Sequence, residues 1–493
     1  MGFLGIDIGT SALKTCLYGL DGTLQTRASI EYGRAGADLH PEQLWNSLRS
    51  AVHKVTSATE FSPISAIAIS SHGESFVPVD ERGEPLCPFI LNTAACGGEE
   101  ADEFERRFGK AEIFAATGLP VHSMYTLPKI AWLRHQRPEL FGRAARFLCV
   151  EDYLMARAGV GPYISTSLAS RTMGLDIIAR CWSPTLLDIA GINADMLAIP
   201  VAPGTPLGTA APAVCAELNL PRNALWVAGG HDQGCCSLGA GGIHERVAVD
   251  GSGTFECLSI PVRRPFLSAA ALRCNFPSEI HTAPNLFLTL AYVAGGIALK
   301  WFRDTLSRSF VEQAANQNAD PYSLMLADLP DEPTDLIAFP HLIGTGTPWL
   351  NGGARGAIFG LDASTTYAQV AKAILEGITM EMLWNIDLQK QSGIELERIH
   401  AVGGGARSST WLQLKADAFG QEVVAIEGEA SCAGAAICAA LGARAFADVD
   451  QATEAFVRPG RSFQPRPEQH ARYREKLAAY QSLAGRVFDF PSP

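Results

Sequence analysis

The stretch Gly5-Ile6-Asp7-Ile8-Gly9-Thr10-Ser11, near the start of the chain, decides the fold class. Apolar residues alternate with others over residues 3–8, and the alternation returns over residues 13–17 after the turn. A period of two is typical of a β-strand with one buried face. The stretch therefore predicts a β-hairpin whose first strand ends in an acid and whose turn consists of glycine and hydroxyl residues.

A similar pattern occurs in the middle of the chain, at Val249-Asp250-Gly251-Ser252-Gly253-Thr254. An acid again ends a strand and is followed by glycine and hydroxyl residues. We therefore expect two α/β domains with a cleft between them, over residues 1–244 and 245–493. Glycine and threonine are also common in ordinary turns, so a purely structural interpretation of the pair stays open at this point.

The rest of the chain alternates between strand-like and helix-like segments, which indicates α/β layering. Asp21-Gly22 adds a second hairpin signal in the first half. Predicted strands cover residues 64–70, 76–79, 86–91, 246–250, 255–260, 287–293, 399–402 and 422–426. Predicted helices begin at Pro41 and cover residues 366–388, 409–419 and 433–447.

Length and charge narrow the function classes. A chain of 493 residues favours two or more domains, and 47% apolar with 18% charged residues is a globular composition. The formal net charge is −12, and no run of lysine or arginine forms a basic patch, which argues against nucleic acid or an anionic membrane as the partner.

The twelve cysteines are scattered without a C-x-x-C pair, and most have apolar neighbours. They are expected to be free thiols of a reducing compartment. The N-terminus lacks the features of a secretory leader, and no apolar run is long enough to span a membrane. We therefore expect a cytoplasmic protein.

The first hairpin suits phosphate chemistry. Small residues at Gly9, Thr10 and Ser11 allow backbone N–H groups and two hydroxyls to approach an anion. Lys14, on the returning strand, could reach a phosphate, and Asp7 is placed to hold Mg2+ directly or through water. The structural alternative is that Asp7 only caps the turn.

Glycines recur at three further turns. Gly253-Thr254 lies in the second hairpin, Gly295-Gly296 follows a predicted strand, and Gly403-Gly404-Gly405 joins a strand to a helix. Such strand-to-helix turns present free N–H groups at the positive end of a helix dipole, although each alone is weak evidence. The chain contains neither a P-loop nor a G-x-G-x-x-G motif, so ATP would bind through the paired hairpins.

A single carboxylate, Asp232, follows an apolar strand and Gly229-Gly230 just before the second half. Phosphoryl transfer needs in-line positioning, charge neutralisation and a group that accepts the hydroxyl proton. We take Asp232 as that base, with a helix N-cap as its structural alternative. His231 is interpreted as a supporting or packing residue.

These segments resemble the sugar kinases named for their FGGY signature, which have an actin-like, duplicated ribonuclease-H-like fold. The resemblance covers nearly the whole chain. It rests on the segments already quoted, to which further stretches are added in the same order: residues 117–120 with Lys129 and Trp132, 167–173, 230–233, Trp301, 356–361 and 375–377.

The resemblance implies roles position by position. Asp232 matches the catalytic base, and Asp7 and Asp232 match the magnesium-linked acids. His72 and Glu74 match the loop that contacts the sugar, together with Asp232. The positions that match the ATP site are Asp7, Gly9, Thr10, Ser11, Lys14, Gly253, Thr254, Gly296, Gly404, Gly405 and Ser409.

The departures from the family pattern put the identity of the sugar in doubt. Members commonly have Trp-x-Asp-x-Arg where this chain has Leu91, Thr93 and Ala95, and a histidine and an arginine where it has Thr365 and Lys372. A pocket without those hydrogen-bond partners should prefer a different or less polar substrate. Loss of efficient catalysis is the other interpretation of these changes.

The leading hypothesis is an ATP-dependent ketose kinase, with the L-fuculokinase-type and xylulokinase-like branches as the two interpretations of the middle region. An actin-like or chaperone-like ATP-binding protein, or a degenerate sugar-binding regulator without kinase activity, are the alternatives. The resemblance is also compatible with a homodimer.

Overall fold

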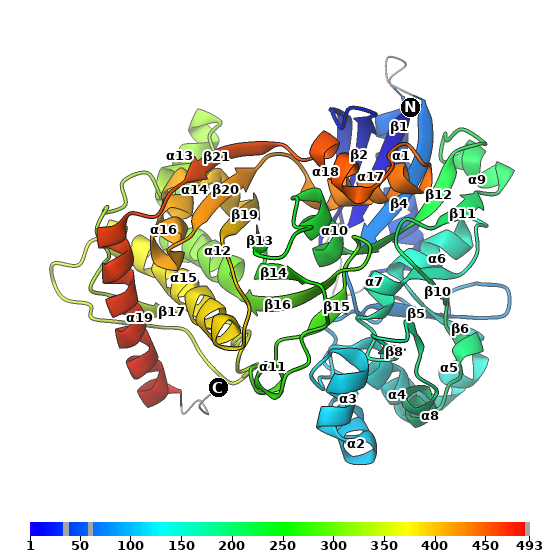
Figure 1. The fold of residues 1–493 in the computed structure, drawn as a ribbon, viewed down its shortest axis with the longest axis horizontal. Coiled ribbons are helices and arrows are strands. Elements are labelled where there is room, and N and C mark those ends of the chain that lie inside the picture. Colours follow the sequence, from blue (N-terminus) through cyan, green and yellow to red (C-terminus); the bar gives the residue numbers. More distant parts are fainter. Residues whose placement is uncertain (33–38, 58–62, 489–493) are drawn as a thin grey trace.

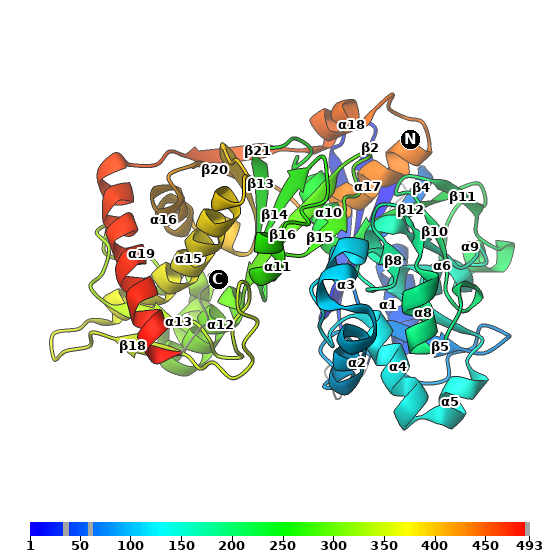
Figure 2. The ribbon, with the colours of Figure 1, turned by 60° about the horizontal axis from the view of Figure 1, so that its bottom comes forward.

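The computed structural model describes residues 1–32, 39–57 and 63–488. Two mixed sheets lie at the centres of two α/β lobes (Figures 1 and 2). We call the part built on the six-stranded sheet the first lobe and the part built on the seven-stranded sheet the second lobe. The expected mixed α/β architecture with two sheets is present.

The first sheet has the order β11-β12-β4-β1-β2-β3. β1 pairs antiparallel with β2 and parallel with β4, and β4 pairs parallel with β12. The β1–β2 pairing is the hairpin predicted around Gly9. The strands are β1 (Gly2–Ile8), β2 (Ala12–Gly19), β3 (Leu24–Glu31), β4 (Ile64–Ser71), β11 (Pro206–Thr209) and β12 (Leu225–His231).

The second sheet repeats this plan, with the order β15-β16-β14-β13-β19-β20-β21. β13 pairs antiparallel with β14 and parallel with β19, as β1 does with β2 and β4. Asp250 of β13 thus has the place that Asp7 has in β1. The strands are β13 (Val247–Ser252), β14 (Glu256–Val262), β15 (Ser278–Ile280), β16 (Phe287–Val293), β19 (Arg398–Gly403), β20 (Glu422–Ile426) and β21 (Pro459–Phe463).

Helices cover the sheets, and four two-stranded pairs complete the lobes. Those before the second sheet are α1 (Pro41–Thr56), α2 (Gly98–Phe108), α3 (Lys110–Thr117), α4 (Thr126–Gln136), α5 (Pro138–Arg143), α6 (Val150–Arg157), α7 (Thr166–Ala169), α8 (Pro184–Ala190), α9 (Pro212–Glu217) and α10 (Asp232–Gly239). Later helices are α11 (Ala269–Arg273), α12 (Gly295–Leu306), α13 (Arg308–Gln317), α14 (Pro321–Met325), α15 (Tyr367–Gln391), α16 (Ser409–Phe419), α17 (Ala430–Gly442), α18 (Val449–Phe456) and α19 (Pro467–Val487). The pairs are β5 (Phe76–Val79) with β6 (Arg146–Cys149), β7 (Tyr163–Ser165) with β10 (Ile199–Val201), β8 (Leu175–Asp176) with β9 (Cys181–Trp182), and β17 (Ile337–Phe339) with β18 (Ala357–Phe359).

Helix α17 comes from the last quarter of the chain but packs on the first sheet. Figure 1 shows it in orange beside the blue strands, with α10 next to it. The contact is close because glycines replace side chains: a Cβ at Gly5 would lie 1.9 Å from the carbonyl oxygen of Cys432, and one at Gly434 would lie 1.9 Å from that of Cys235. The first lobe therefore includes a helix that lies, in the sequence, between β20 and β21, the last two strands of the second sheet.

Two predicted elements are wrong in part. Residues 86–91 form only isolated bridges, from Phe89 to Leu39 and from Ile90 to Phe76, because Pro85 and Pro88 remove two ladder donors. The Ala-rich helix begins at Ala430 and ends at Gly442, earlier than predicted, since the chain turns to a positive φ at Arg444. The boundary between residues 244 and 245 stays a prediction. Among the described residues no helix is both long and apolar enough to cross a bilayer.

Candidate active site

Asp232 is the first residue of helix α10, directly after strand β12. The N-cap is His231, so the N-cap alternative for Asp232 is displaced by one residue. The strand approaches β4 so closely that a Cβ at Gly229 would lie 1.9 Å from the carbonyl oxygen of Ile69. The two glycines thus let the strand deliver a half-buried carboxylate to the sheet edge.

Asp7 lies close enough to Asp232 for the two acids to interact. Burial and then Asp232 raise the pKa of Asp7 to about 7, although Ser70 Oγ donates a hydrogen bond of 2.8 Å to its carboxylate. Burial also raises the pKa of Asp232, and His231 and His72 oppose that shift. Two neighbouring carboxylates, one of which raises the pKa of the other, are typical of a site that binds a cation or handles a proton.

Strand β13 of the second lobe lies next to helix α10, the helix that begins with Asp232. A Cβ at Gly251 would lie 3.9 Å from Cys236 Sγ. Burial, followed by Asp232, Asp7 and then Asp250, raises the pKa of Cys236 to about 12. Acids of both lobes therefore converge on the first turns of α10.

The first hairpin places its turn at the surface. Thr10 and Ser11 are both exposed, and the turn is closed by a 3.0 Å hydrogen bond from Gly9 N to Ala12 O. Lys14 does not point freely outward, because its Nζ lies 2.7 Å from Glu429 at the start of α17. The turn can receive an anion, whereas Lys14 would first have to leave its partner.

The predicted glycines of the second lobe meet at one cavity of about 510 Å³, which is a usual size for a small-molecule site. A Cβ at Gly296 would lie 1.8 Å from the carbonyl oxygen of Gly253, and Gly404 N donates to Ser252 O at 3.0 Å. Glycine is required where backbones meet this closely. The lining residues include Ser252, Gly253, Glu256, Gly296, Leu299, Tyr322, Gly404, Gly405, Arg407, Ser408, Ser409 and Trp411.

The predicted sugar loop, residues 72–74, belongs to the first lobe, as Asp232 does. Glu74 has a positive φ of 66° and is buried against Arg171, whose Nη2 and Nε donate to Glu74 Oε1 at 2.6 and 2.8 Å. Burial alone would raise the pKa of Glu74, but Arg171, His231 and Lys129 together outweigh it, so that the pKa is lowered. His72 is buried with Nδ1 3.1 Å from Ile8 O, and its Nε2 has no hydrogen-bond partner in the described part of the chain.

Sequence reasoning missed three charged residues at the site, Arg171, Glu279 and Lys415. Arg171 lies within a quoted segment, but a lone arginine carries no signal for its partner. Glu279 lies on β15 and contacts both Arg171 and His231. Lys415, beneath the cavity, lies 2.6 Å from Asp250 and 3.3 Å from Glu256. None of these pairs is readable from sequence spacing.

The departures from the family pattern fall in two places. Leu91 accepts a 2.9 Å hydrogen bond from Lys129 Nζ through its carbonyl, so this stretch is tied to α4 by its backbone. Lys372 donates to three carbonyls of residues 330–332 within the second lobe. The change at Lys372 therefore concerns the packing of the second lobe.

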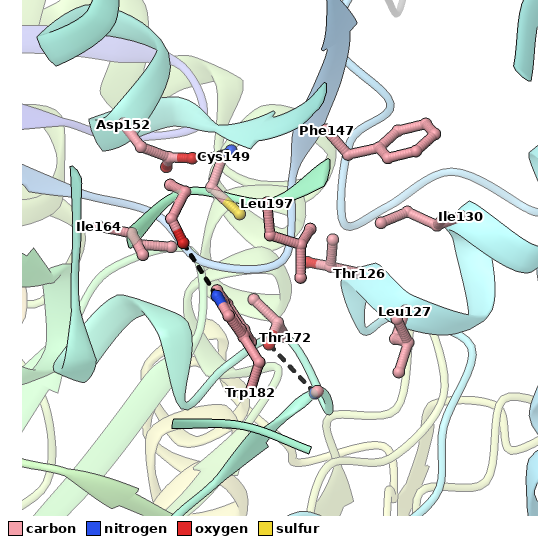
Figure 3. A pocket seen from close by; sticks show the side chains of 12 residues that line it. Thr126, Leu127, Ile130, Phe147, Cys149, Asp152, Ile164, Thr172, Trp182 and Leu197 are labelled. Carbon is pink, nitrogen blue, oxygen red and sulfur yellow. Dashed lines mark hydrogen bonds between the residues drawn. The ribbon is translucent and has the colours of Figure 1, made fainter. Parts of the chain in front are cut away.

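Behind the sugar loop lies a small internal cavity (Figure 3), lined by Thr126, Cys149, Thr172, Trp182 and other mostly apolar residues. Trp182 Nε1 donates to Ala198 O at 2.9 Å across it. Its volume of about 10 Å³ is near that of a single water, so it is no substrate site. Thr126 Oγ1 also donates to Glu74 O at 3.0 Å, which anchors the loop to this wall.

A divalent cation fits the acids that the sequence predicts for it. No cluster of three or more His, Cys, Asp or Glu groups suited to a metal occurs in residues 1–32, 39–57 and 63–488. Asp7 and Asp232 are nevertheless two mutually repelling carboxylates, and phosphate oxygens and water commonly complete the coordination of Mg2+. The donor chemistry is therefore that of a site shared with a nucleotide.

Family models match both halves of the chain. The N-terminal domain of the FGGY family of carbohydrate kinases matches residues 3–239, and its C-terminal domain matches residues 251–443. The chain belongs to the FGGY family of carbohydrate kinases. It is thus a phosphotransferase of the sugar-kinase type, which uses ATP and acts on a small molecule.

Individual relatives agree with this assignment. The chain is 28% identical to a xylulose kinase of Bacillus subtilis, over 97% of this chain and 96% of the relative. It is 28% identical to a gluconokinase of the same organism, over 88% and 86%. The solved ligand-bound xylulose kinase of Lactobacillus acidophilus has a TM-score of 0.88 at 21% identity, covering 99% and 98% of the two chains.

A second solved structure shares the fold. Plasmodium falciparum glycerol kinase with ADP has a TM-score of 0.86 at 20% identity, covering 99% of this chain and 98% of that one. The predicted actin-like fold and the predicted family are confirmed.

Proposed function

We propose that this carbohydrate kinase transfers the γ-phosphoryl group of ATP to a hydroxyl group of a ketose, xylulose-like or fuculose-like. The proposal rests on Asp232, a half-buried carboxylate beside Asp7 at the start of α10. Sugar-loop residues His72 and Glu74 lie on one side of it, and the cavity of about 510 Å³ lies in the other lobe. This is the arrangement that two substrates with one shared base require.

Each group has a task in this reaction. Asp232 accepts the proton of the attacking hydroxyl while the new oxygen–phosphorus bond forms and the bond to ADP breaks. The glycine turns at Gly253, Gly296, Gly404 and Gly405, with Ser409, hold the nucleotide. Gly9, Thr10 and Ser11, with Lys14 once it leaves Glu429, bind the phosphates. Thr254, next to Gly253 in the turn between β13 and β14, also binds the phosphates.

We further propose that Mg2+ is held by Asp7 and Asp232. When bound it would neutralise phosphate charge, which is the largest electrostatic requirement of the reaction. The cytoplasm is the proposed location, supported by free thiols, of which Cys16, Cys235 and Cys432 are buried. A homodimer stays a prediction, to be checked by light scattering.

Charge favours a neutral sugar over gluconate, although a gluconokinase is as similar to this chain as a xylulose kinase. Near the sugar loop the acids are Asp7, Asp232, Glu74 and Glu279, against the cations Arg171, His231 and Lys129. An extra carboxylate would meet this excess of negative charge. The uncharged hydroxyls of a ketose would find acceptors instead.

The substrate can be tested with a panel of ketoses, aldoses, polyols and gluconate, assayed by coupled ADP release. We expect turnover with a ketose and little with gluconate. ATP hydrolysis that does not depend on any sugar would favour the actin-like alternative. Binding of sugar or nucleotide without ADP production would favour the regulator.

The base is tested by Asp232→Asn. We expect kcat to fall ~10²–10⁴-fold, the usual scale for a lost general base, while ATP binding measured by calorimetry survives. Asp188→Asn, which changes an acid with an 84% exposed side chain in the same lobe, is the control. Sugar phosphorylation near the wild-type rate in Asp232→Asn would refute the assignment.

A further inference from the structure

Strand β15 is the edge strand of the second sheet, and it lies against the first lobe. Ser278 N donates to Gly118 O at 2.7 Å, and Ile280 N donates to Ser170 Oγ at 3.1 Å. A Cβ at Gly118 would lie 2.4 Å from the carbonyl oxygen of Ser278. The two lobes are therefore in backbone contact along this strand.

The contact continues to the helix that carries the proposed base. Thr282 Oγ1 donates to Gly234 O at 2.6 Å, and a Cβ at Gly230 would lie 2.2 Å from Thr282 Cγ2. His281 Nε2 lies 3.1 Å from Ser237 Oγ, further along the same helix. Residues 278–282 of the second lobe thus contact the chain on both sides of Asp232, at Gly230 before it and at Gly234 and Ser237 after it.

Glu279, in the middle of this strand, is fully buried between two cations of the first lobe. Its Oε2 lies 3.0 Å from His231 Nδ1 and 3.5 Å from Arg171 Nε. Arg171 also binds Glu74, and His231 Nε2 lies 3.2 Å from Asp232 Oδ1. A continuous chain of charged contacts runs from the sugar loop to the base, and its middle link belongs to the other lobe.

The two cations also fix the backbone of the sugar loop. A Cβ at Gly73 would lie 3.1 Å from the ring of His231 and 3.3 Å from Arg171 Cβ, so the loop rests directly on both side chains. Gly73 lies between His72 and Glu74. If Arg171 and His231 move, the loop that carries both predicted sugar ligands must move with them.

We propose that Glu279 is a positioning residue for the sugar site, which holds Arg171 and His231 so that the loop at residues 72–74 and Asp232 face one substrate. Because Glu279 comes from the second lobe, the sugar site is complete only when β15 is seated on the first lobe. This links sugar binding to the relative placement of the lobes. The inference rests on the proposed function for its kinetic readout only.

The test compares Glu279→Gln with Glu376→Gln in the full chain. Both side chains are 0% exposed, and Glu376 is held by Lys476 at 2.7 Å inside the second lobe, so the two substitutions remove similar buried charges. We expect Glu279→Gln to raise the KM for the sugar ~10-fold or more, the scale of a lost charged hydrogen bond, and to leave the KM for ATP within about twofold. Glu376→Gln should leave both KM values within about twofold of wild type.

A double variant separates positioning from general destabilisation. In an Arg171→Gln background, adding Glu279→Gln should raise the KM for the sugar by less than about threefold, because the link is already broken. Full multiplication of the two effects would overturn the proposal. So would a sugar KM in Glu279→Gln equal to that of Glu376→Gln.

A second readout does not depend on turnover. Hydrogen exchange of the peptide that contains residues 72–76 should be at least several-fold faster in Glu279→Gln and unchanged in Glu376→Gln. If the wild-type protein phosphorylates no sugar but exchange at residues 72–76 is still faster in Glu279→Gln, the proposed function is refuted and the role of Glu279 is supported. Unchanged exchange in Glu279→Gln would overturn the inference, whatever the kinetics.

Discussion

The β1–β2 and β13–β14 hairpins have the same strand pairing, but their acids, Asp7 and Asp250, have different partners. Asp7 in β1 accepts a single hydrogen bond from Ser70 and faces Asp232. Asp250, at the equivalent place in β13, is bound at 2.6 Å by Lys415, which is itself fully buried. In the described residues of the first lobe no cation forms an ion pair with Asp7, and Lys14 only partly offsets its charge, whereas the second lobe pairs the corresponding acid directly with a lysine.

Lys415 does more than balance one charge. Its Nζ also lies 3.0 Å from Ser252 Oγ, 3.3 Å from Glu256 Oε1 and 4.4 Å from the centre of the Trp411 ring. It therefore supports the wall of the nucleotide cavity. A repeated turn can serve chemistry in one lobe and scaffolding in the other, and the difference is set by which cation reaches the acid.

The largest effect should come from removing that cation. Lys415→Met leaves Asp250 and Glu256 buried together without a partner, which costs ~3–5 kcal/mol and lowers Tm on the order of 5–10 °C. Scanning fluorimetry measures it. Adding Asp250→Asn should restore part of the loss. A Tm near wild type in Lys415→Met would mean that the second hairpin needs no internal cation.

Asp7→Asn sharpens the comparison from the other side. Because Asp7 forms no ion pair within the described part of the chain, we expect kcat to fall ~10²–10³-fold while Tm stays equal or rises. Asp250→Asn is the matched substitution, and should instead lower Tm and leave kcat within about threefold. The two outcomes are read by coupled ADP release and scanning fluorimetry. Equal kinetic losses in both variants would show that the hairpins share one role.

The smallest effect concerns pH. Burial, then Asp250, raises the pKa of Glu256 to about 8 from 4.5, with Lys415 opposing. Between those pH values the folded chain binds more protons at Glu256 than the unfolded chain, so its contribution to the free energy of unfolding falls as pH rises from about 4.5 to about 8. Glu256→Gln should remove this fall and gain roughly 1–3 kcal/mol near pH 8.

Urea titrations at pH 5 and pH 8 measure the difference. Glu312→Gln, which changes an exposed acid of the second lobe, is the control and should keep the wild-type pH dependence. A Glu256→Gln variant with the wild-type slope would mean that Glu256 is ionised in the folded protein.

Local patterns were enough to predict both hairpins and the position of Asp232. A period of two, glycines in the turns and an acid at a strand end are signals within a few residues of each other. The apolar residues at 86–91 predict a strand, but the structure has only isolated bridges there. Pro85 and Pro88 lack the N–H groups that a ladder needs, and they are the sequence signal against a strand.

The charged partners could not be predicted in this way. Asp250 and Lys415 are 165 residues apart, and Glu74 and Arg171 are 97 apart. Such pairs form because strands and helices from distant segments pack together, and no spacing rule relates their positions. Lys14 was expected to be available for phosphate, and only the placement of α17 reveals Glu429 as its partner.

The packing of α17 on the first sheet has a consequence for synthesis. β1 leaves the ribosome long before α17, and the carbonyl that Gly5 accommodates belongs to Cys432 of that helix. The apolar face of β1 and its neighbouring strands is therefore covered only after α17 has been synthesised. Nascent chains that stop near residue 244 would expose this face, which makes them clients for chaperones and candidates for degradation.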